Sequence, residues 1–100
     1  MVDYREALDD AIANARVSLP RDAYGAATYS LHYGPTGGGA EMSWDDALKA
    51  LRAWADDLSD VELTEYGFDD DGEEVEYVAG VIDSRDIVAG VIGRDLASYL

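Results

Sequence analysis

The most distinctive chemistry of this chain is a long stretch of carboxylates with no basic residue among them. No lysine or arginine occurs from Ala53 through Ser84. The same interval contains twelve acidic residues, namely Asp56, Asp57, Asp60, Glu62, Glu65, Asp69, Asp70, Asp71, Glu73, Glu74, Glu76 and Asp83. Carboxylates at this density repel other anions and attract basic surfaces. The interval therefore predicts a basic protein partner, and neither free nucleic acid nor an anionic membrane is expected to bind.

Two interpretations of this acidic interval are open. Runs of like charge are usually solvated faces, and a general acidic surface is the first interpretation. The second is a binding surface. Asp56 and Asp57 favour it, because they fall at the C-terminal end of an expected helix, where negative charge lowers stability, and acids at such a position indicate a role other than stability. A hairpin with carboxylates on alternate residues would also approach the charge density of DNA. The expected partner-binding residues are Asp56, Asp57, Asp60, Glu62, Glu65, Asp69, Asp70, Asp71, Glu73, Glu74 and Glu76.

Other site chemistries find little support in the sequence. There is no cysteine, which excludes disulfides, thiolate metal sites and cysteine nucleophiles. His32 is the single histidine, and no serine lies in a Gly-x-Ser-x-Gly turn. No spacing selects a pair of carboxylates for acid–base work. We therefore expect a protein that is not an enzyme.

Two loops contain residues that could in principle bind a ligand. Residues 69–72, Asp-Asp-Asp-Gly, resemble part of a calcium loop, but aligning Gly72 with position 6 places Gly67 and Val78 at the end-ligand positions. The glycine-rich residues 34–39 lack the Lys-Ser/Thr of a P-loop. We expect a hairpin turn at 69–72, a loop at 34–39, and neither a metal nor a cofactor.

Length and composition indicate a folded domain. The chain has 100 residues, of which 48% are hydrophobic, and a net charge of −15. This is enough apolar material for a small core, so we predict one compact acidic domain over residues 1–100. The N-terminus has no apolar segment typical of a signal peptide, and no apolar run is long enough to span a membrane. A cytoplasmic location is therefore expected, within the host cell if the protein is phage-encoded.

Residues 43–58 give the strongest secondary-structure signal. Seven apolar residues follow steps of three and four and fall on one face of a helix: Trp44, Ala47, Leu48, Leu51, Trp54, Ala55 and Leu58. Ser43 is a suitable N-cap. Such an apolar face predicts a helix packed against a sheet or another helix.

The remaining elements were predicted from periodicity and end signals. Residues 3–19 predict a helix capped by Asp3, and a third helix begins at Asp83 or Ser84 with an apolar face that reaches Tyr99. Alternation predicts strands over residues 23–33, 61–68 and 73–79, with a short return strand at 40–42. The order is helix, hairpin, helix, hairpin, helix. The predicted class is α+β, with a small antiparallel sheet of two hairpins packed with about three helices.

The small size, strong acidity and continuous acidic interval from Asp56 to Glu76 resemble the phage-encoded anti-CRISPR proteins and acidic DNA-mimic inhibitors. This group shares no sequence motif, so no residue role is carried over. The resemblance implies an inhibitor that occupies the nucleic-acid-binding surface of a host defence complex, such as a CRISPR effector.

Two alternatives remain. Abundant aspartate, a single lysine (Lys49) and many alanine, valine and glycine residues also resemble halophilic archaeal proteins. In that case the acids provide solubility in high salt, and the domain has a small binding or structural role. The other alternative is an enzyme subunit or an antitoxin-like partner that neutralises a basic protein. A halophilic protein is expected to unfold in dilute buffer, whereas a mimic has to fold at ordinary salt.

Overall fold

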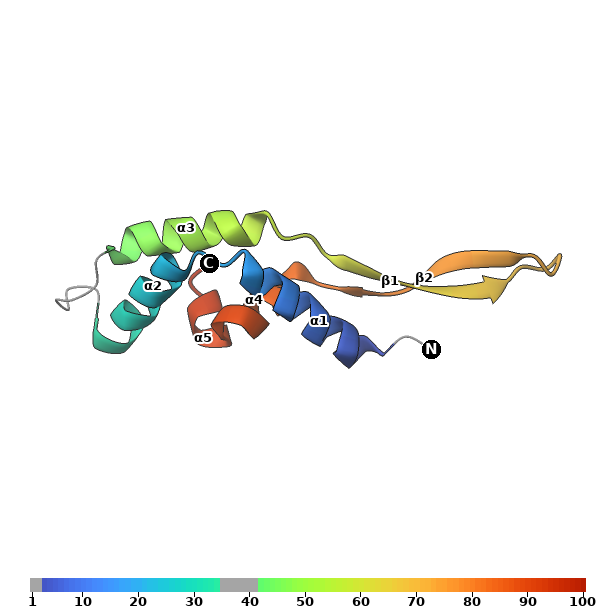
Figure 1. Ribbon diagram of the computed structural model, residues 1–100, viewed down its shortest axis with the longest axis horizontal. Helices are drawn as coiled ribbons and strands as arrows, with labels where there is room; N and C mark the ends of the chain where they lie inside the picture. Colours follow the sequence, from blue (N-terminus) through green and yellow to red (C-terminus); the bar gives the residue numbers. More distant parts are fainter. Residues whose placement is uncertain (1–2, 35–41) are drawn as a thin grey trace.

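The computed structural model describes residues 3–34 and 42–100. Within these residues, three helices are followed by a two-stranded antiparallel hairpin and then by two further helices. The helices gather at one end of the molecule, and the hairpin projects away from them (Figure 1). The molecule is elongated, with extents of 67 × 20 × 19 Å. Its radius of gyration is 18.1 Å, whereas a compact chain of this length has about 13 Å.

Helix α3 (Trp44–Asp56) supplies much of the core, as the sequence predicts. The Ser43 hydroxyl accepts a hydrogen bond from the backbone N–H of Asp46 at 3.2 Å and caps the helix. Four residues at helical spacing are buried on its inner face: Ala47, Leu48, Leu51 and Trp54. The Trp54 Nε1 donates to the Ser18 hydroxyl at 3.1 Å, which ties α3 to the end of the first helix.

Helix α1 (Tyr4–Val17) and helix α4 (Ser84–Ile92) pack closely. Asp3 caps α1, and the Asp83 carboxylate caps α4 by accepting from the Arg85 N–H, as predicted for both helix starts. Gly90 lies against Ile12, and a Cβ at Gly90 would come 2.8 Å from the Ile12 Cγ1. A side chain larger than hydrogen at residue 90 would therefore force the Ile12 side chain to move.

Helix α2 (Arg21–Tyr33) replaces the strand predicted over residues 23–33, so that prediction was wrong. Its buried residues are Ala23, Ala26, Ala27 and Ser30, which follow steps of three and four. Leu31 and Tyr33, two of the residues that suggested alternation, are exposed, and so is His32. Most of the predicted loop 34–39 and return strand 40–42 lies outside the described residues.

The C-terminal helical segment is broken at Gly93. This residue has φ +89°, a conformation that strongly favours glycine, and it separates α4 from the short helix α5 (Arg94–Ala97). Leu96 is buried in the core, while Tyr99 contacts Trp44 edge to face with ring centroids 5.1 Å apart. The apolar residues predicted for this segment therefore pack against the body, but they come from two short helices and not from one continuous helix.

The hairpin consists of β1 (Val61–Phe68) and β2 (Glu74–Ile82). The predicted hairpin in this region is confirmed, and with it the α+β class. The prediction of two hairpins covered by helices was wrong, because the described residues contain one hairpin and most of it projects beyond the helices. Only its base reaches the core, where Ile82 is 0% exposed and Leu63 is half-buried. We refer to residues Val61–Ile82 as the arm.

Candidate functional site

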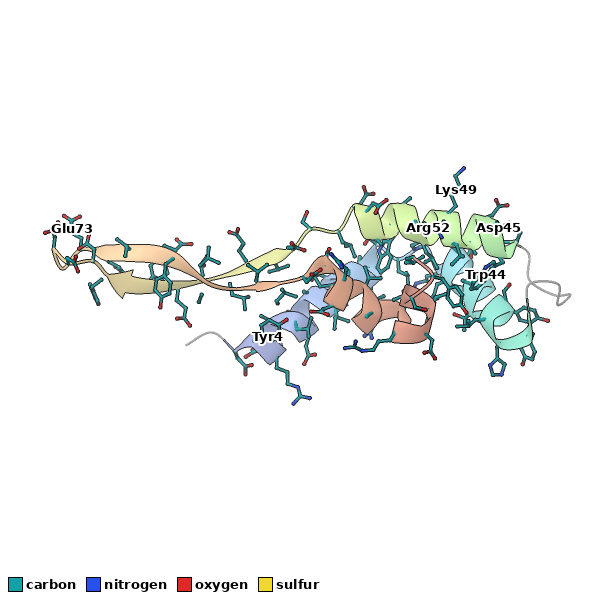
Figure 2. The ribbon with its side chains drawn as sticks, turned by 180° about the vertical axis from the view of Figure 1, so that it is seen from behind. Tyr4, Trp44, Asp45, Lys49, Arg52 and Glu73 are labelled. Atoms are coloured by element: carbon teal, nitrogen blue, oxygen red, sulfur yellow. The ribbon has the colours of Figure 1, made fainter. Side chains whose placement is uncertain are left out.

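The arm carries most of the acidic residues expected to bind a partner. Eight carboxylates and no basic residue occur among its 22 residues, and all seven lysines and arginines of the chain lie outside it. Asp56 and Asp57 lie at the C-terminal end of α3, and Asp60 immediately precedes the arm. The eight on the arm are Glu62, Glu65, Asp69, Asp70, Asp71, Glu73, Glu74 and Glu76. Glu73 lies at the far tip, at the opposite end of the molecule from Asp45 and Lys49 (Figure 2).

Asp60 fixes the base of the arm to the helical body. Its Oδ1 accepts a hydrogen bond from the backbone N–H of Ser84 at 2.7 Å, at the start of α4. The two ends of the arm are thereby held together next to the buried Ile82. Of the predicted binding residues, Asp60 therefore has a structural role in the fold.

Asp69 shapes the tip of the arm. Its Oδ1 accepts hydrogen bonds from the backbone N–H groups of Asp71 at 3.0 Å and Glu73 at 2.8 Å. The Gly72 N–H donates to the Asp69 carbonyl, and Gly72 has φ +80°. These features define a three-residue hairpin loop, a β-turn followed by a glycine bulge, as predicted for residues 69–72. The tip is therefore fixed by its own hydrogen bonds and leaves Asp70 and Asp71 exposed.

The register divides the arm into two different faces. Residues directly opposite each other on antiparallel strands share a face. The register shifts between Leu63, which lies opposite Gly80, and Thr64, which lies opposite Val78. Ala79 therefore has no partner on β1 and is assigned to neither face. One face, here called the tyrosine face, contains Leu63, Glu65, Gly67, Val75 and Tyr77. The other, here called the ladder face, contains Thr64, Tyr66, Phe68, Glu74, Glu76 and Val78.

The tyrosine face is held by its own contacts. The Tyr77 hydroxyl donates a hydrogen bond to the Glu65 Oε2 at 2.9 Å. The Tyr77 ring lies over Gly67, where an added Cβ would come within 3.1 Å of its Cε1. The hydrogen bond to the Glu65 carboxylate and its negative charge raise the pKa of Tyr77. Tyr77 is therefore protonated at neutral pH and remains the donor to Glu65.

The ladder face leaves its side chains open to solvent. Tyr66 is 69% and Phe68 is 78% exposed, so both rings are largely accessible to a partner. Tyr66 lies opposite Glu76, and Phe68 lies opposite Glu74. Within residues 3–34 and 42–100, the Glu74 and Glu76 carboxylates have no hydrogen-bond or ion-pair partner. Two cross-strand pairs of this face thus combine an exposed ring with an unpaired carboxylate.

Tyr66 and Phe68 were not among the residues predicted for the site. The signal was available in the strand sequence. Val61 and Leu63 are apolar in one phase of the alternation, whereas Tyr66 and Phe68 are apolar in the opposite phase. A strand that changes its apolar phase has no single buried face, which is typical of a ribbon exposed on both sides.

No preformed metal site is evident on the arm. In the part of the chain that the structure describes, no group of three or more histidine, cysteine, aspartate or glutamate side chains could hold a metal ion. Asp69, the best-placed ligand of the acidic turn, already accepts two backbone hydrogen bonds. The absence of metal binding at residues 69–72 stays a prediction.

Comparison of the chain with protein-family models, curated proteins and solved structures finds no match. Among the described helices, none has both the length and the apolar character needed to cross a membrane. The chemistry of the arm is therefore the basis for a functional proposal.

Proposed function

We propose that the protein inhibits a nucleic-acid-handling complex by inserting its acidic arm into the basic groove that would otherwise hold nucleic acid. The observation that carries this proposal is the concentration of eight carboxylates, without one basic residue, on a ribbon that projects from the body. The role is one of binding rather than catalysis. A CRISPR effector or another host defence complex is the expected class of partner.

The charge spacing along the arm supports this mimicry. Eight residues of β1 extend about 27 Å at about 3.4 Å per residue. Four of the eight carboxylates lie on the turn beyond β1, so the full length that carries them is about 35 Å. This gives on average about one charge per 4.4 Å, which is close to the phosphate spacing of about 3.4 Å in a single nucleic-acid strand. A groove that accepts a phosphate backbone would therefore meet a similar linear charge density on the arm.

The independence of the arm from the core also supports the proposal. Its side chains beyond Leu63 are not part of the hydrophobic core, so their chemistry is free to serve a partner. Asp56, Asp57 and Asp60 lie near its base and would extend the acidic surface toward the body. Asp60 would contribute charge only, since its carboxylate already binds the Ser84 N–H.

The test begins with capture of partners at about 0.15 M salt from a lysate that contains nucleic-acid-handling complexes. A labelled DNA or RNA ligand of the captured complex is then titrated with the wild-type protein and with a Glu74→Lys/Glu76→Lys variant. Removing two attractive charges and adding two repulsive ones should weaken displacement at least about tenfold. The effect should diminish as salt increases.

A matched control carries the same charge change on the body. Asp9 and Asp10 are exposed on α1, so Asp9→Lys/Asp10→Lys alters net charge equally without touching the arm. This variant should displace the ligand nearly as well as wild type. If both double variants lose affinity equally, only net charge matters, and the arm is not a specific inhibitory surface. If neither loses affinity, the acidic arm is not the inhibitory surface.

A further inference from the structure

The ladder face is an apolar and charged surface that no other described element covers. Tyr66, Phe68 and Val78 are all at least half exposed, and they line one side of a ribbon that stands clear of the helices. A two-stranded hairpin alone in water is marginally stable, and clustered exposed apolar side chains mark interaction sites. An occupant of this face has to match both its rings and its carboxylates.

A second copy of the chain fits poorly. Pairing two arms would bring together two ribbons with eight carboxylates each and no cation to separate them. Like charges placed directly across a sheet are destabilising, and carboxylates along an edge strand prevent self-pairing. The charge of the ladder face instead requires a cationic occupant.

We infer that the ladder face docks arginine side chains of the partner, with Tyr66–Glu76 and Phe68–Glu74 each receiving one guanidinium group. Side chains directly opposite on antiparallel strands have Cβ atoms about 5 Å apart, so a ring and a carboxylate can contact the same cation. A guanidinium group is planar, stacks on an aromatic face and pairs with a carboxylate through two N–H groups. A lysine ammonium would pair with the carboxylate but gain less from the ring.

The opposite side of the arm shows why the inference is limited to the ladder face. The tyrosine face also has an aromatic residue opposite a carboxylate, Tyr77 across from Glu65. There the hydroxyl of the ring donates to the carboxylate, and the ring lies over Gly67. The Glu65 carboxylate thus already accepts a hydrogen bond from Tyr77, whereas Glu74 and Glu76 accept no hydrogen bond from any described residue. The two faces thus provide an internal comparison.

This inference rests on the proposed function and adds the residue type that the basic groove presents. It is tested with the intact protein and two probes, a hexa-arginine and a hexa-lysine peptide, at about 0.05 M salt. Binding is measured by NMR titration of the backbone amide resonances of the arm, which the wild type and every variant retain. The arginine peptide should bind at least about fivefold more tightly, since each exposed cation–π contact contributes roughly a factor of two to five.

Substitutions separate the ring from the charge. A Tyr66→Leu/Phe68→Leu variant should bind both peptides equally within about twofold, because the rings that distinguish them are gone. Glu74→Gln/Glu76→Gln should weaken both peptides and keep a preference for arginine. Tyr77→Leu, on the opposite face, should leave the preference unchanged. Amide spectra of the helical body report that each variant is folded.

Equal binding of the two peptides to wild type, or an arginine preference that survives loss of both rings, would overturn the inference. Neither result would affect the charge-based competition that tests the proposed function. Conversely, a clear arginine preference that depends on Tyr66 and Phe68 would stand even if the arm displaced no nucleic acid. The two proposals can therefore fail separately.

Discussion

Shortening the arm tests whether it is a separate functional element or part of the fold. In the variant we consider, residues 66–76 are replaced by Asn-Gly, a two-residue sequence that favours the turn of a tight hairpin. The new turn joins Glu65 to Tyr77, which lie opposite each other in the register. Leu63 and Ile82, the arm residues that pack against the helices, are retained.

The expected change in the free energy of unfolding is within about 1 kcal/mol. None of the deleted side chains belongs to the hydrophobic core, and Tyr66 and Phe68 are mostly exposed. The deletion also removes six carboxylates, so the net charge changes from −15 to −9. Reduced self-repulsion should offset part of any loss in dilute buffer.

Urea unfolding, followed by tryptophan fluorescence and far-ultraviolet circular dichroism, measures this change. Both tryptophans lie on α3, so their fluorescence reports on the body. Ile82→Ala is the positive control, because Ile82 is fully buried at the base of the same hairpin and its truncation should cost about 2–5 kcal/mol. If shortening the arm costs as much as this control, the arm is part of the cooperative fold, contrary to our reasoning.

Three further predictions concern the body and the tyrosine face. Trp54→Ala should lower the free energy of unfolding by about 3–5 kcal/mol, since the Trp54 side chain is 6% exposed. A decrease in that free energy of less than about 1 kcal/mol, measured by urea unfolding, would contradict the place of Trp54 in the core. Gly25→Ala should stabilise α2 by up to about 1 kcal/mol, because no other atom lies within 4 Å of a Cβ added at this residue. Gly90→Ala should instead destabilise the protein by about 1–3 kcal/mol, because the added Cβ contacts Ile12. Thermal melts in which both variants shift the melting temperature in the same direction would refute the comparison. Because Glu65 raises the pKa of Tyr77, their hydrogen bond should persist below the ordinary tyrosine pKa and be lost as pH rises through the raised value. Glu65→Gln should lower that pKa toward its usual value, as measured by NMR titration of the ring.

The sequence predicted those elements whose apolar residues were large and whose ends had clear caps. Ser43 before α3, Asp3 before α1 and Asp83 before α4 all accept the capping hydrogen bonds that their positions suggested. The hairpin of strands 61–68 and 73–79 also followed from alternation and the turn at Asp69 to Gly72, although β2 continues to Ile82. In each case the local propensity and the tertiary environment favour the same structure.

Helix α2 could not be recognised in this way because its buried face consists of small residues. Ala26 and Ala27 add little to an apolar pattern, whereas the exposed Leu31 and Tyr33 dominate it and alternate with polar neighbours. One available signal was the spacing of Tyr29 and Tyr33. Residues four apart are neighbours on a helix surface, and these two rings have centroids 4.7 Å apart.

The projection of the arm was beyond what strand alternation can predict. Alternation indicates which residues share a face, but it does not indicate whether another element covers that face. Val75 and Tyr77, two residues apart on β2, do share a face, yet no described helix covers the distal arm. The change of apolar phase between Leu63 and Tyr66 was the one sequence feature that pointed to a ribbon exposed on both sides.

Acidic residues on the arm and at its base differ in their physical roles. Asp60 and Asp69 accept backbone hydrogen bonds and hold the base and tip of the arm. Glu74 and Glu76 have no such partner among the described residues and stand beside exposed rings. If the acids served solubility alone, exposed aromatic side chains among them would work against that purpose, because apolar patches promote association. A surface that combines free carboxylates with free rings is instead suited to a partner that offers both positive charge and a flat stacking face. This combination favours a binding role for the arm over a solubility role.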